Sequence, residues 1–251
     1  MSILELDNVT KTFDGVRAVD RTTLGFDKGK ITSLIGPNGA GKTTVFNLIS
    51  GFLHPDEGVI SYQDRPISGL APWDIAQMGI GRLFQDVRLF NQMTVKDNVL
   101  TAFKKQRGES ALMSVIARWK VAKEEQLLSS RAMKLLDFVG LAEKEEELAE
   151  NLSYGQQKLL SIARLLGADA DLFLLDEPTA GINPQMVKVF LDVIRRLTEE
   201  GKTVIVIEHN MNVVIEISDW VYFMDEGQVV SFGLPNEVLG DPEVRAAYVG
   251  L

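Results

Sequence analysis

Gly36-Pro37-Asn38-Gly39-Ala40-Gly41-Lys42-Thr43 is the stretch of this sequence that decides the fold. It fits the pattern G-x-x-x-x-G-K-[ST], in which glycines let the backbone approach a phosphate group without a Cβ in the way. Residues 30–35 before it predict a buried strand, and residues 44–49 after it predict the start of a helix. A strand, a glycine-rich loop and a helix in this order predict a phosphate-binding loop that presents backbone N–H groups to an anion.

Two side chains of this loop carry the chemistry that a bound nucleotide needs. Lys42 can reach the β- and γ-phosphates, and the hydroxyl of Thr43 can bind Mg²⁺. The residues of the loop that we expect to contact the nucleotide are Gly36, Asn38, Gly39, Gly41, Lys42, Thr43 and Thr44. The alternative is a glycine-rich turn without a ligand, and the pattern by itself predicts no more than a nucleotide.

The composition sets limits on what the chain can be. Its 251 residues, of which 45% are apolar, suffice for a substantial core in one or two domains. The formal net charge of −9 would repel a nucleic-acid backbone, so we expect no nucleic-acid partner. The chain has no cysteine, which excludes disulfides and cysteine metal sites. It shows no signal peptide and no window of about 18 consecutive apolar residues, so a role at a membrane would require a partner.

Three apolar runs, residues 31–35, 172–175 and 203–207, are typical of strands buried on both faces of a parallel sheet. The phosphate-binding loop, the pair Asp176-Glu177 and the pair Glu208-His209 come directly after them. Ligands of open α/β sheets bind at the carboxyl ends of the strands. We therefore expect these three strand ends to form one shared site.

The rest of the chain predicts two further parts next to this core, one made of antiparallel strands and one made of helices. Residues 2–9, 18–26 and 58–67 resemble short antiparallel strands joined by turns. Residues 86–166 look largely helical and lie between core strands without a linker, which indicates an insertion. Within them, the charge run 143–147 predicts the solvated face of a helix.

A second cluster of motifs lies between residues 152 and 177. The sequence Leu152-Ser153-Tyr154-Gly155-Gln156-Gln157 precedes a helical pattern and contains the capping-box spacing S-x-x-Q, so an ordinary helix start is one interpretation. The strand that ends in Asp176 and Glu177 follows closely. Asp176 would hold Mg²⁺ through water, and Glu177 would polarise an attacking water as a general base. The alternative for this pair is a surface turn before Pro178.

The chain contains two histidines with different surroundings. His209 follows the predicted strand 203–207, where it would sense the γ-phosphate, and the alternative is a purely structural histidine. His54 lies in a predicted loop, and we expect no role for it.

These residues together resemble the ATP-binding subunits of ABC transporters, and the resemblance covers essentially the whole chain. The phosphate-binding loop, the signature at 152–156 and the run 171–177 occur in the family's order and at its spacing. The implied fold is α/β, a P-loop NTPase core with a mostly parallel sheet, an N-terminal antiparallel β subdomain and an inserted α-helical subdomain. The implied organisation is a single domain, residues 1–251, with its core at 1–85 and 167–251 and its helical subdomain at 86–166.

The resemblance also implies roles for residues outside the phosphate-binding loop. Gln85 matches the family's Q-loop, which implies a part in catalysis and in the Mg²⁺ site, and Phe13 matches the aromatic residue that stacks on adenine. Residues 180–183 match the D-loop, and His209 matches the switch histidine. The signature is implied to act in trans on the ATP of a second subunit, through Ser153, Gly155 and Gln156.

The expected ligands are therefore ATP and Mg²⁺. The expected catalytic residues are Glu177, His209, Lys42 and Gln85, and the expected Mg²⁺ ligands are Thr43, Gln85 and Asp176. Two positions depart from the family pattern, because Tyr154 replaces the usual glycine and Asn183 the usual aspartate. We expect them to tune communication across a dimer and to leave the site active, since every residue needed for phosphate, metal and water is present.

Further details resemble the ATPases of branched-chain amino-acid importers, namely residues 152–157, 180–184, 207–211 and 241–250. In that group the implied partners are two transmembrane permease subunits, a second ABC ATPase in a homo- or heterodimer, and indirectly a substrate-binding protein. This chain resembles the larger ATPase of the pair. The implied location is peripheral, on the cytoplasmic face of the cell (inner) membrane.

Several alternatives remain open or disfavoured. Related ATPases serve urea or amide transport and lipopolysaccharide export, and the sequence does not contain the cargo's identity. A non-transport ABC ATPase is disfavoured because the chain has one cassette and no room for a long coiled coil. A simple P-loop kinase or GTPase is disfavoured by the signature and its spacing. Leu89, Phe90 and Met93 either line a groove for the coupling helix of a membrane subunit or pack the helical subdomain's own core.

Overall fold

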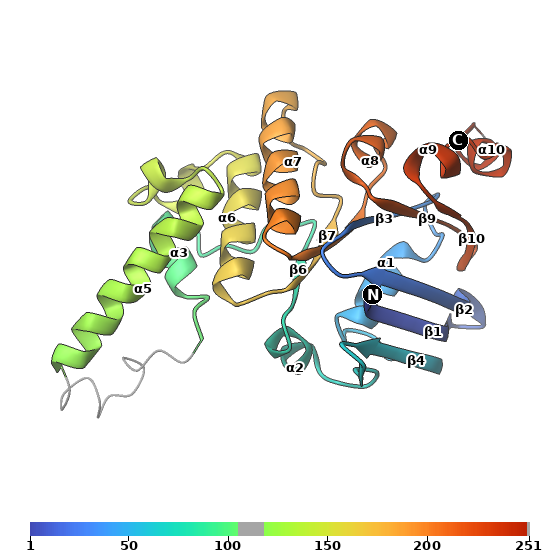
Figure 1. The fold of residues 1–251 in the computed structure, drawn as a ribbon, viewed down its shortest axis with the longest axis horizontal. Helices are drawn as coiled ribbons and strands as arrows, with labels where there is room; N and C mark the ends of the chain where they lie inside the picture. The colour runs from blue at the N-terminus through green and yellow to red at the C-terminus, as the bar shows by residue number, and fades with distance from the viewer. Residues whose placement is uncertain (105–117, 250–251) are drawn as a thin grey trace. The chain divides into compact units, whose positions relative to one another are not determined.

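A computed structural model describes residues 1–104 and 118–249, and the described chain divides into two compact units (Figure 1). The first unit consists of Met1–Gln85, Asp171–Ala180 and Ile194–Leu251. The second unit consists of Asp86–Ala170 and Gly181–Val193. Gly250, in the C-terminal part of the sequence resemblance, lies outside the described residues.

The larger sheet of the first unit has the strand order β10-β9-β3-β8-β7-β6. Neighbouring strands from β9 to β6 run parallel, and β10 is antiparallel to β9. Every residue of β3 and β8 is buried, as the apolar and β-branched residues that dominate both strands predict for strands covered on both faces. The exception in β3 is Ser33, whose hydroxyl lies 2.6 Å from that of Ser218. The strands are β3 Ile31–Ile35, β6 Ile80–Leu83, β7 Leu172–Asp176, β8 Thr203–Ile207, β9 Trp220–Asp225 and β10 Gln228–Gly233.

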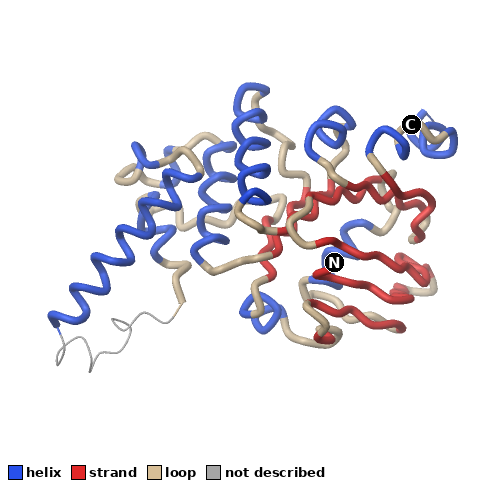
Figure 2. The backbone as a smooth tube through the Cα atoms, viewed as in Figure 1, coloured by secondary structure: helices blue, strands red, loops and turns tan. Residues whose placement is uncertain are grey.

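The smaller sheet is antiparallel, in the order β2-β1-β4-β5, and includes β1 Ser2–Phe13 and β2 Val16–Asp27. Helix α1, Lys42–Ile49, packs between the two sheets, because its buried side chains join residues of both in one core cluster (Figures 1 and 2). The expected strand 58–67 is instead two strands, β4 Glu57–Tyr62 and β5 Arg65–Pro66. Gln63 and Asp64 both have positive φ, 50° and 60°, which forms a turn between them.

Short helices complete the first unit. Val214 of α8 and Val238 of α9 share a second core cluster with Ile35, Val221 and Phe223, so these helices cover part of the larger sheet. The helices are α2 Pro72–Gln77, α8 Met211–Ile217, α9 Pro235–Val238 and α10 Pro242–Val249. The expected α/β class with a mostly parallel sheet and an antiparallel N-terminal sheet is confirmed.

The second unit is helical in its described part and contains no strand there (Figure 2). Helices α3 Val95–Leu100, α5 Arg118–Phe138 and α6 Tyr154–Gly167 pack on one another. The first part of α7, Pro184–Glu199, belongs to this unit as well. No helix in the described ranges, 1–104 and 118–249, is long and apolar enough to span a membrane.

The charge run 143–147 does not form the face of an α-helix, and that prediction was wrong. Only a 3₁₀ turn, η2 Ala142–Lys144, is present, followed by a second 3₁₀ turn, η3 Ala149–Asn151. The carbonyls of Glu145 and Glu147 accept hydrogen bonds from the N–H groups of Lys96 and Val95, and Lys96 Nζ lies 2.9 Å from Glu145 Oε2. These contacts with the start of α3 replace the backbone hydrogen bonds that an α-helix over residues 143–147 would have made within itself.

Candidate functional site

The carboxyl ends of β3, β8 and β7 meet at one cavity of about 190 Å³ in the first unit. These strands are neighbours in the sheet, and Ile207 of β8 pairs with Leu34 of β3 and with Asp176 of β7. The expected convergence of the three strand ends is therefore confirmed. The cavity is lined by Ala18, Asn38, Gly39, Ala40, Gly41, Lys42, Thr43, Thr44, Glu177, Ile207 and His209.

The loop after β3 is held in a conformation that needs glycine. Gly36 has φ 147°, and a Cβ there would lie 2.0 Å from the carbonyl oxygen of Met224. Gly41 has φ 98°, and a Cβ there would lie 2.2 Å from the carbonyl oxygen of Ala18. Gly41 also begins helix α1 without a side-chain cap, so the first N–H groups of this helix are available to an anion at the cavity.

Lys42 lies in the wall of the cavity and is 5% exposed. Its Nζ donates hydrogen bonds of 2.8 Å to the carbonyl oxygens of Gly36 and Pro37. Burial lowers the pKa of Lys42, and the nearby charges of Glu177 and Asp176 act in the opposite direction. The Lys42 ammonium therefore stands at the loop, where the negative charge of a bound phosphate would stabilise its charged form further.

The carboxylate of Glu177 contacts two of the other residues expected in catalysis, His209 and Gln85. His209 Nε2 lies 3.0 Å from its Oε1, and Gln85 Nε2 donates to its Oε2 over 3.3 Å. The N–H of Glu177 donates to the carbonyl oxygen of Ile207 over 3.0 Å. Glu177 has φ 46°, in the left-handed region that side-chain-bearing residues rarely adopt, and such strain clusters at functional sites.

Two polar residues organise this site although the sequence alone assigned neither of them a role: Glu208 was named only as the neighbour of His209 at a strand end, and Arg82 was not named. Glu208 is 3% exposed, and its carboxylate accepts from the backbone of His209 (2.8 Å) and Asn210 (3.1 Å) and from the Thr179 hydroxyl. Arg82 lies on β6, and its Nη2 donates to Asp176 Oδ2 over 3.1 Å. The sequence did contain a signal for both residues, because Glu208 directly follows the buried strand β8 and Arg82 lies within the mostly apolar strand β6.

Phe13 lies at the end of β1 and is 41% exposed, with Lys11 Nζ 5.6 Å from the centre of its ring. Asp56 anchors this end of the strand, because its carboxylate accepts from Lys11 Nζ and from the Thr12 N–H, each over 2.7 Å. The Lys11 hydrogen bond is the largest cause that lowers the pKa of Asp56. Phe13 therefore presents a half-exposed ring on a fixed strand end.

The signature residues lie in the second unit at the start of α6. Ser153 caps this helix, and the expected capping box is present, with Ser153 N–H donating to Gln156 Oε1 over 3.0 Å. The box and the signature therefore coexist in the same residues. Gly155 is buried, and a Cβ there would lie 2.4 Å from Met186 Cγ.

The two departures from the family pattern also lie in the second unit. Tyr154 is 39% exposed and packs beside Gly181, where a Cβ would lie 3.2 Å from its Cε1. Lys158 Nζ is 4.9 Å from the centre of the Tyr154 ring. Asn183 Oδ1 accepts from the N–H of Met186 over 2.9 Å, which caps the start of α7. The shape of an aspartate cap is thus retained without its charge.

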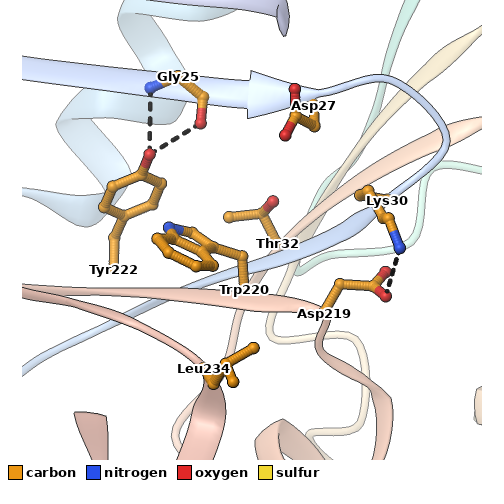
Figure 3. Close-up of a pocket in the computed structure, with 8 residues that line it drawn as sticks. All are labelled: Gly25, Asp27, Lys30, Thr32, Asp219, Trp220, Tyr222 and Leu234. Carbon is orange, nitrogen blue, oxygen red and sulfur yellow. Dashed lines mark hydrogen bonds and ion pairs between the residues drawn. The ribbon is translucent and has the colours of Figure 1, made fainter. Parts of the chain in front are cut away.

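A separate cavity of about 400 Å³ lies near the amino end of β3 (Figure 3). Its polar side chains are engaged with the chain itself, since Lys30 Nζ lies 3.0 Å from Asp219 Oδ1 and the Tyr222 hydroxyl donates to the carbonyl oxygen of Gly25 over 2.8 Å. Trp220 and Leu234 add apolar surface. The expected site residues do not line this cavity, which lies at the end of β3 opposite to the phosphate-binding loop.

Comparison with known proteins decides the family. The family described as ABC transporter matches residues 19–180. The chain belongs to this family. As an ABC ATPase it is 38% identical over 250 residues to the probable branched-chain amino acid transport ATP-binding protein LivG of Archaeoglobus fulgidus, covering 100% of this chain and 96% of the relative. It is 37% identical to the high-affinity branched-chain amino acid transport ATP-binding protein LivG of Escherichia coli, with coverages of 99% and 98%.

Solved ABC cassettes share the fold. The ADP conformation of MJ1267, an ATP-binding cassette of an ABC transporter, is similar with a TM-score of 0.86 and 34% identity over 100% of both chains. A dimeric post-hydrolysis state of the cassette MJ0796, bound to ADP and Pi, is similar with a TM-score of 0.75 and 26% identity, over 92% of this chain and 98% of that one.

The close approach of the Met224 carbonyl to Gly36 predicts that a side chain at position 36 would disturb the phosphate-binding loop. We expect Gly36→Ala to lower the free energy of unfolding by about 1–3 kcal/mol and to weaken nucleotide binding, because the new Cβ would collide with the Met224 carbonyl. Urea unfolding and nucleotide titration measure the two effects. Gly29→Ala is the control, since Gly29 also has positive φ, 71°, but no atom lies within 4 Å of a Cβ there. Equal losses in the two variants would contradict this explanation.

Proposed function

We propose that this ABC ATPase hydrolyses ATP to power the import of branched-chain or related amino acids across the cytoplasmic membrane. The observation that supports ATP chemistry is the single cavity shared by the phosphate-binding loop, Glu177 and His209. The cargo is inferred from relatives that match along nearly the whole chain and are described as branched-chain amino acid transport ATP-binding proteins. We take residues 1–251 as one ABC domain, with its core at 1–85 and 167–251 and its helical subdomain at 86–166.

ATP is proposed to bind with its phosphates in the loop after β3. The backbone N–H groups at the start of α1 and the ammonium of Lys42 would compensate the phosphate charge. The adenine ring would stack on Phe13, which is half-exposed at the end of β1. The loop residues proposed to contact the nucleotide are Gly36, Asn38, Gly39, Gly41, Lys42, Thr43 and Thr44.

The residues present suit a Mg²⁺ ion that is held mainly by phosphate oxygens. In the described residues no group of three His, Cys, Asp or Glu side chains forms a metal cage, and Mg²⁺ in nucleotide sites needs only one or two carboxylates. The proposed protein ligands are the Thr43 hydroxyl, Asp176 and Gln85. The ion would neutralise charge on the β- and γ-phosphates.

Glu177 is proposed as the general base. It would accept a proton from a water molecule as the water oxygen attacks the γ-phosphorus, and ADP would leave from the opposite side. His209 and Gln85 contact different oxygens of the Glu177 carboxylate, so they can fix its orientation toward that water. Lys42 would stabilise the charge that develops on the phosphate oxygens.

The signature is proposed to act on the ATP of a second ABC subunit. Ser153, Gly155 and Gln156 stand at the N-terminus of α6, a 14-residue helix whose dipole favours an anion. Two ATP molecules would then join two subunits, as a homodimer or with a second, similar ATPase. A dimeric state is described for the similar cassette MJ0796.

The proposed membrane partners are two transmembrane permease subunits, with a substrate-binding protein acting indirectly through them. The chain would be peripheral, on the cytoplasmic face of the cell (inner) membrane. Phe90 is 50% exposed, while Leu89 and Met93 are partly buried, so this segment offers apolar surface for a coupling helix. We keep core packing as the alternative role for Leu89 and Met93.

Replacing the proposed base should separate binding from hydrolysis. We expect Glu177→Gln to bind ATP and to dimerise but to hydrolyse it about 10²–10⁴-fold more slowly, since the amide cannot accept the proton. Phosphate release and size-exclusion chromatography with ATP measure the two properties. Glu200→Gln, at an exposed position on the same compact unit, should retain the wild-type rate. Normal hydrolysis by Glu177→Gln would show that another group is the base.

Replacing the loop lysine should act on binding itself. We expect Lys42→Ala to weaken ATP binding about 10–100-fold, because it removes charged hydrogen bonds to the phosphates. Calorimetric titration with ATP measures this affinity. Lys30→Ala is the matched control, because Lys30 directly precedes β3, at the end of that strand opposite to the phosphate-binding loop, and its side chain is 55% exposed. An unchanged affinity in Lys42→Ala would contradict the phosphate-binding role of the loop.

Capture of partners tests the transport function. A tagged Glu177→Gln chain in its native cell, with ATP and gently solubilised membranes, should retain two multi-span subunits, a second ABC ATPase and an amino-acid-binding protein. Recovery of lipopolysaccharide-export or urea-transport subunits instead would contradict the proposed cargo and assign the chain to that related system. Recovery of no membrane protein would contradict the transport function and leave the ATPase chemistry intact.

A further inference from the structure

Arg82 contacts both a proposed metal ligand, Asp176, and the helix α1, which carries another proposed ligand. Its side chain is 7% exposed on β6. Nη2 donates to Asp176 Oδ2 over 3.1 Å, and Nη1 donates to Asn47 Oδ1 over 2.7 Å and to Ser50 Oγ over 3.0 Å. One guanidinium therefore connects the end of β7 with helix α1.

The surroundings hold this guanidinium in one place. The rings of Phe84 and Phe46 lie 4.9 Å and 5.7 Å from its central carbon. The planar fork of arginine gives each hydrogen bond a fixed direction, which a lysine ammonium cannot do. A buried ion pair is weak evidence for stability, because the cost of desolvation offsets most of the attraction. The geometry of the contacts is thus a better guide to the role of Arg82 than their number.

The positions of its partners relate to the two metal ligands. Asn47 is four residues after Thr43 in α1, so their side chains lie one turn apart on the same face of the helix. Asp176 accepts the hydrogen bond of Arg82 through Oδ2, so this bond does not occupy Oδ1. Arg82 therefore fixes Asp176 relative to the helix that carries Thr43 and leaves one carboxylate oxygen for a ligand.

We propose that Arg82 is a positioning residue for the divalent cation of this site. It sets the separation and orientation of Asp176 and Thr43 by holding Asp176 Oδ2 and Asn47 Oδ1 with the two arms of one guanidinium. The inference rests on the proposed Mg²⁺ ligands and adds a residue that does not itself touch the ion. Partners that orient metal ligands typically change metal affinity by about 10–100-fold when they are removed.

The test compares nucleotide binding with and without the cation. The affinity of the purified full-length chain for a non-hydrolysable, fluorescent ATP analogue is measured in EDTA and over a series of Mg²⁺ concentrations. We expect Arg82→Met to raise the half-saturating Mg²⁺ concentration about tenfold or more and to leave the affinity in EDTA unchanged. Arg82→Lys, which keeps the charge and loses the fork, should lie between Arg82→Met and the wild type. Asn47→Ala should shift the Mg²⁺ requirement in the same direction.

Controls separate this role from a structural one. Lys202→Met removes the ion pair with Asp171 (2.8 Å) just before β7 begins and should not change the Mg²⁺ requirement. In an Asp176→Asn background, Arg82→Met should have no further effect. An unchanged Mg²⁺ requirement in Arg82→Met, or an equal loss of affinity in EDTA and in Mg²⁺, would overturn the inference alone. Mg²⁺-independent binding by the wild type would overturn the proposed metal site and the inference with it.

Discussion

The parallel register of β3, β8 and β7 is the constraint on which the site depends. Ile207 pairs with Leu34 on one side and with Asp176 on the other, so the residues that follow these strands must emerge at one edge of the sheet. The strands are apolar and covered on both faces, and a slip of one residue would break the parallel ladder and move polar groups into the core. Burial of ordinary aliphatic side chains therefore fixes the relative positions of the phosphate-binding loop, Glu177 and His209.

Charge at this edge is balanced by structure that the chain itself supplies. Asp176, Glu177 and Glu208 place three carboxylates near the cavity proposed to bind the phosphates, which would be unfavourable if they were unpartnered. The Glu208 carboxylate instead accepts hydrogen bonds from backbone N–H groups and a hydroxyl, and the charge of Asp176 is balanced by the guanidinium of Arg82. Glu177, by contrast, contacts the side chains of His209 and Gln85, both of which are expected to act in catalysis. Glu208 and Asp176 are thus bonded to groups that hold the surrounding chain together, and the proposed base is bonded to other proposed catalytic residues.

The sequence predicted those parts of the fold whose cause is local. The glycine loop, the apolar strands and the capping box at Ser153 each depend on residues within a few positions, and the structure contains all of them. The Arg82–Asp176 pair joins residues 94 positions apart, and no periodicity in the sequence relates them. The charge run 143–147 failed as a helix for the same reason, since its carbonyls bond with residues near 95. Hydrogen bonds between segments far apart in the sequence therefore overrode the local charge pattern, and only Glu143 and Glu146 of the run are exposed.

The departures at Tyr154 and Asn183 gain a physical meaning from their neighbours. The Tyr154 ring occupies the space beside Gly181, whose φ of 73° and missing Cβ allow the close approach. Gly155 is packed more closely still against Met186, since a Cβ there would lie 2.4 Å from Met186 Cγ, and Asn183 caps the helix that carries Met186. The signature and residues 181–183 of the D-loop are therefore packed against each other within one compact unit. A glycine at 154 would lack this contact, so the tyrosine adds packing between the two motifs that face a second subunit in the proposed dimer.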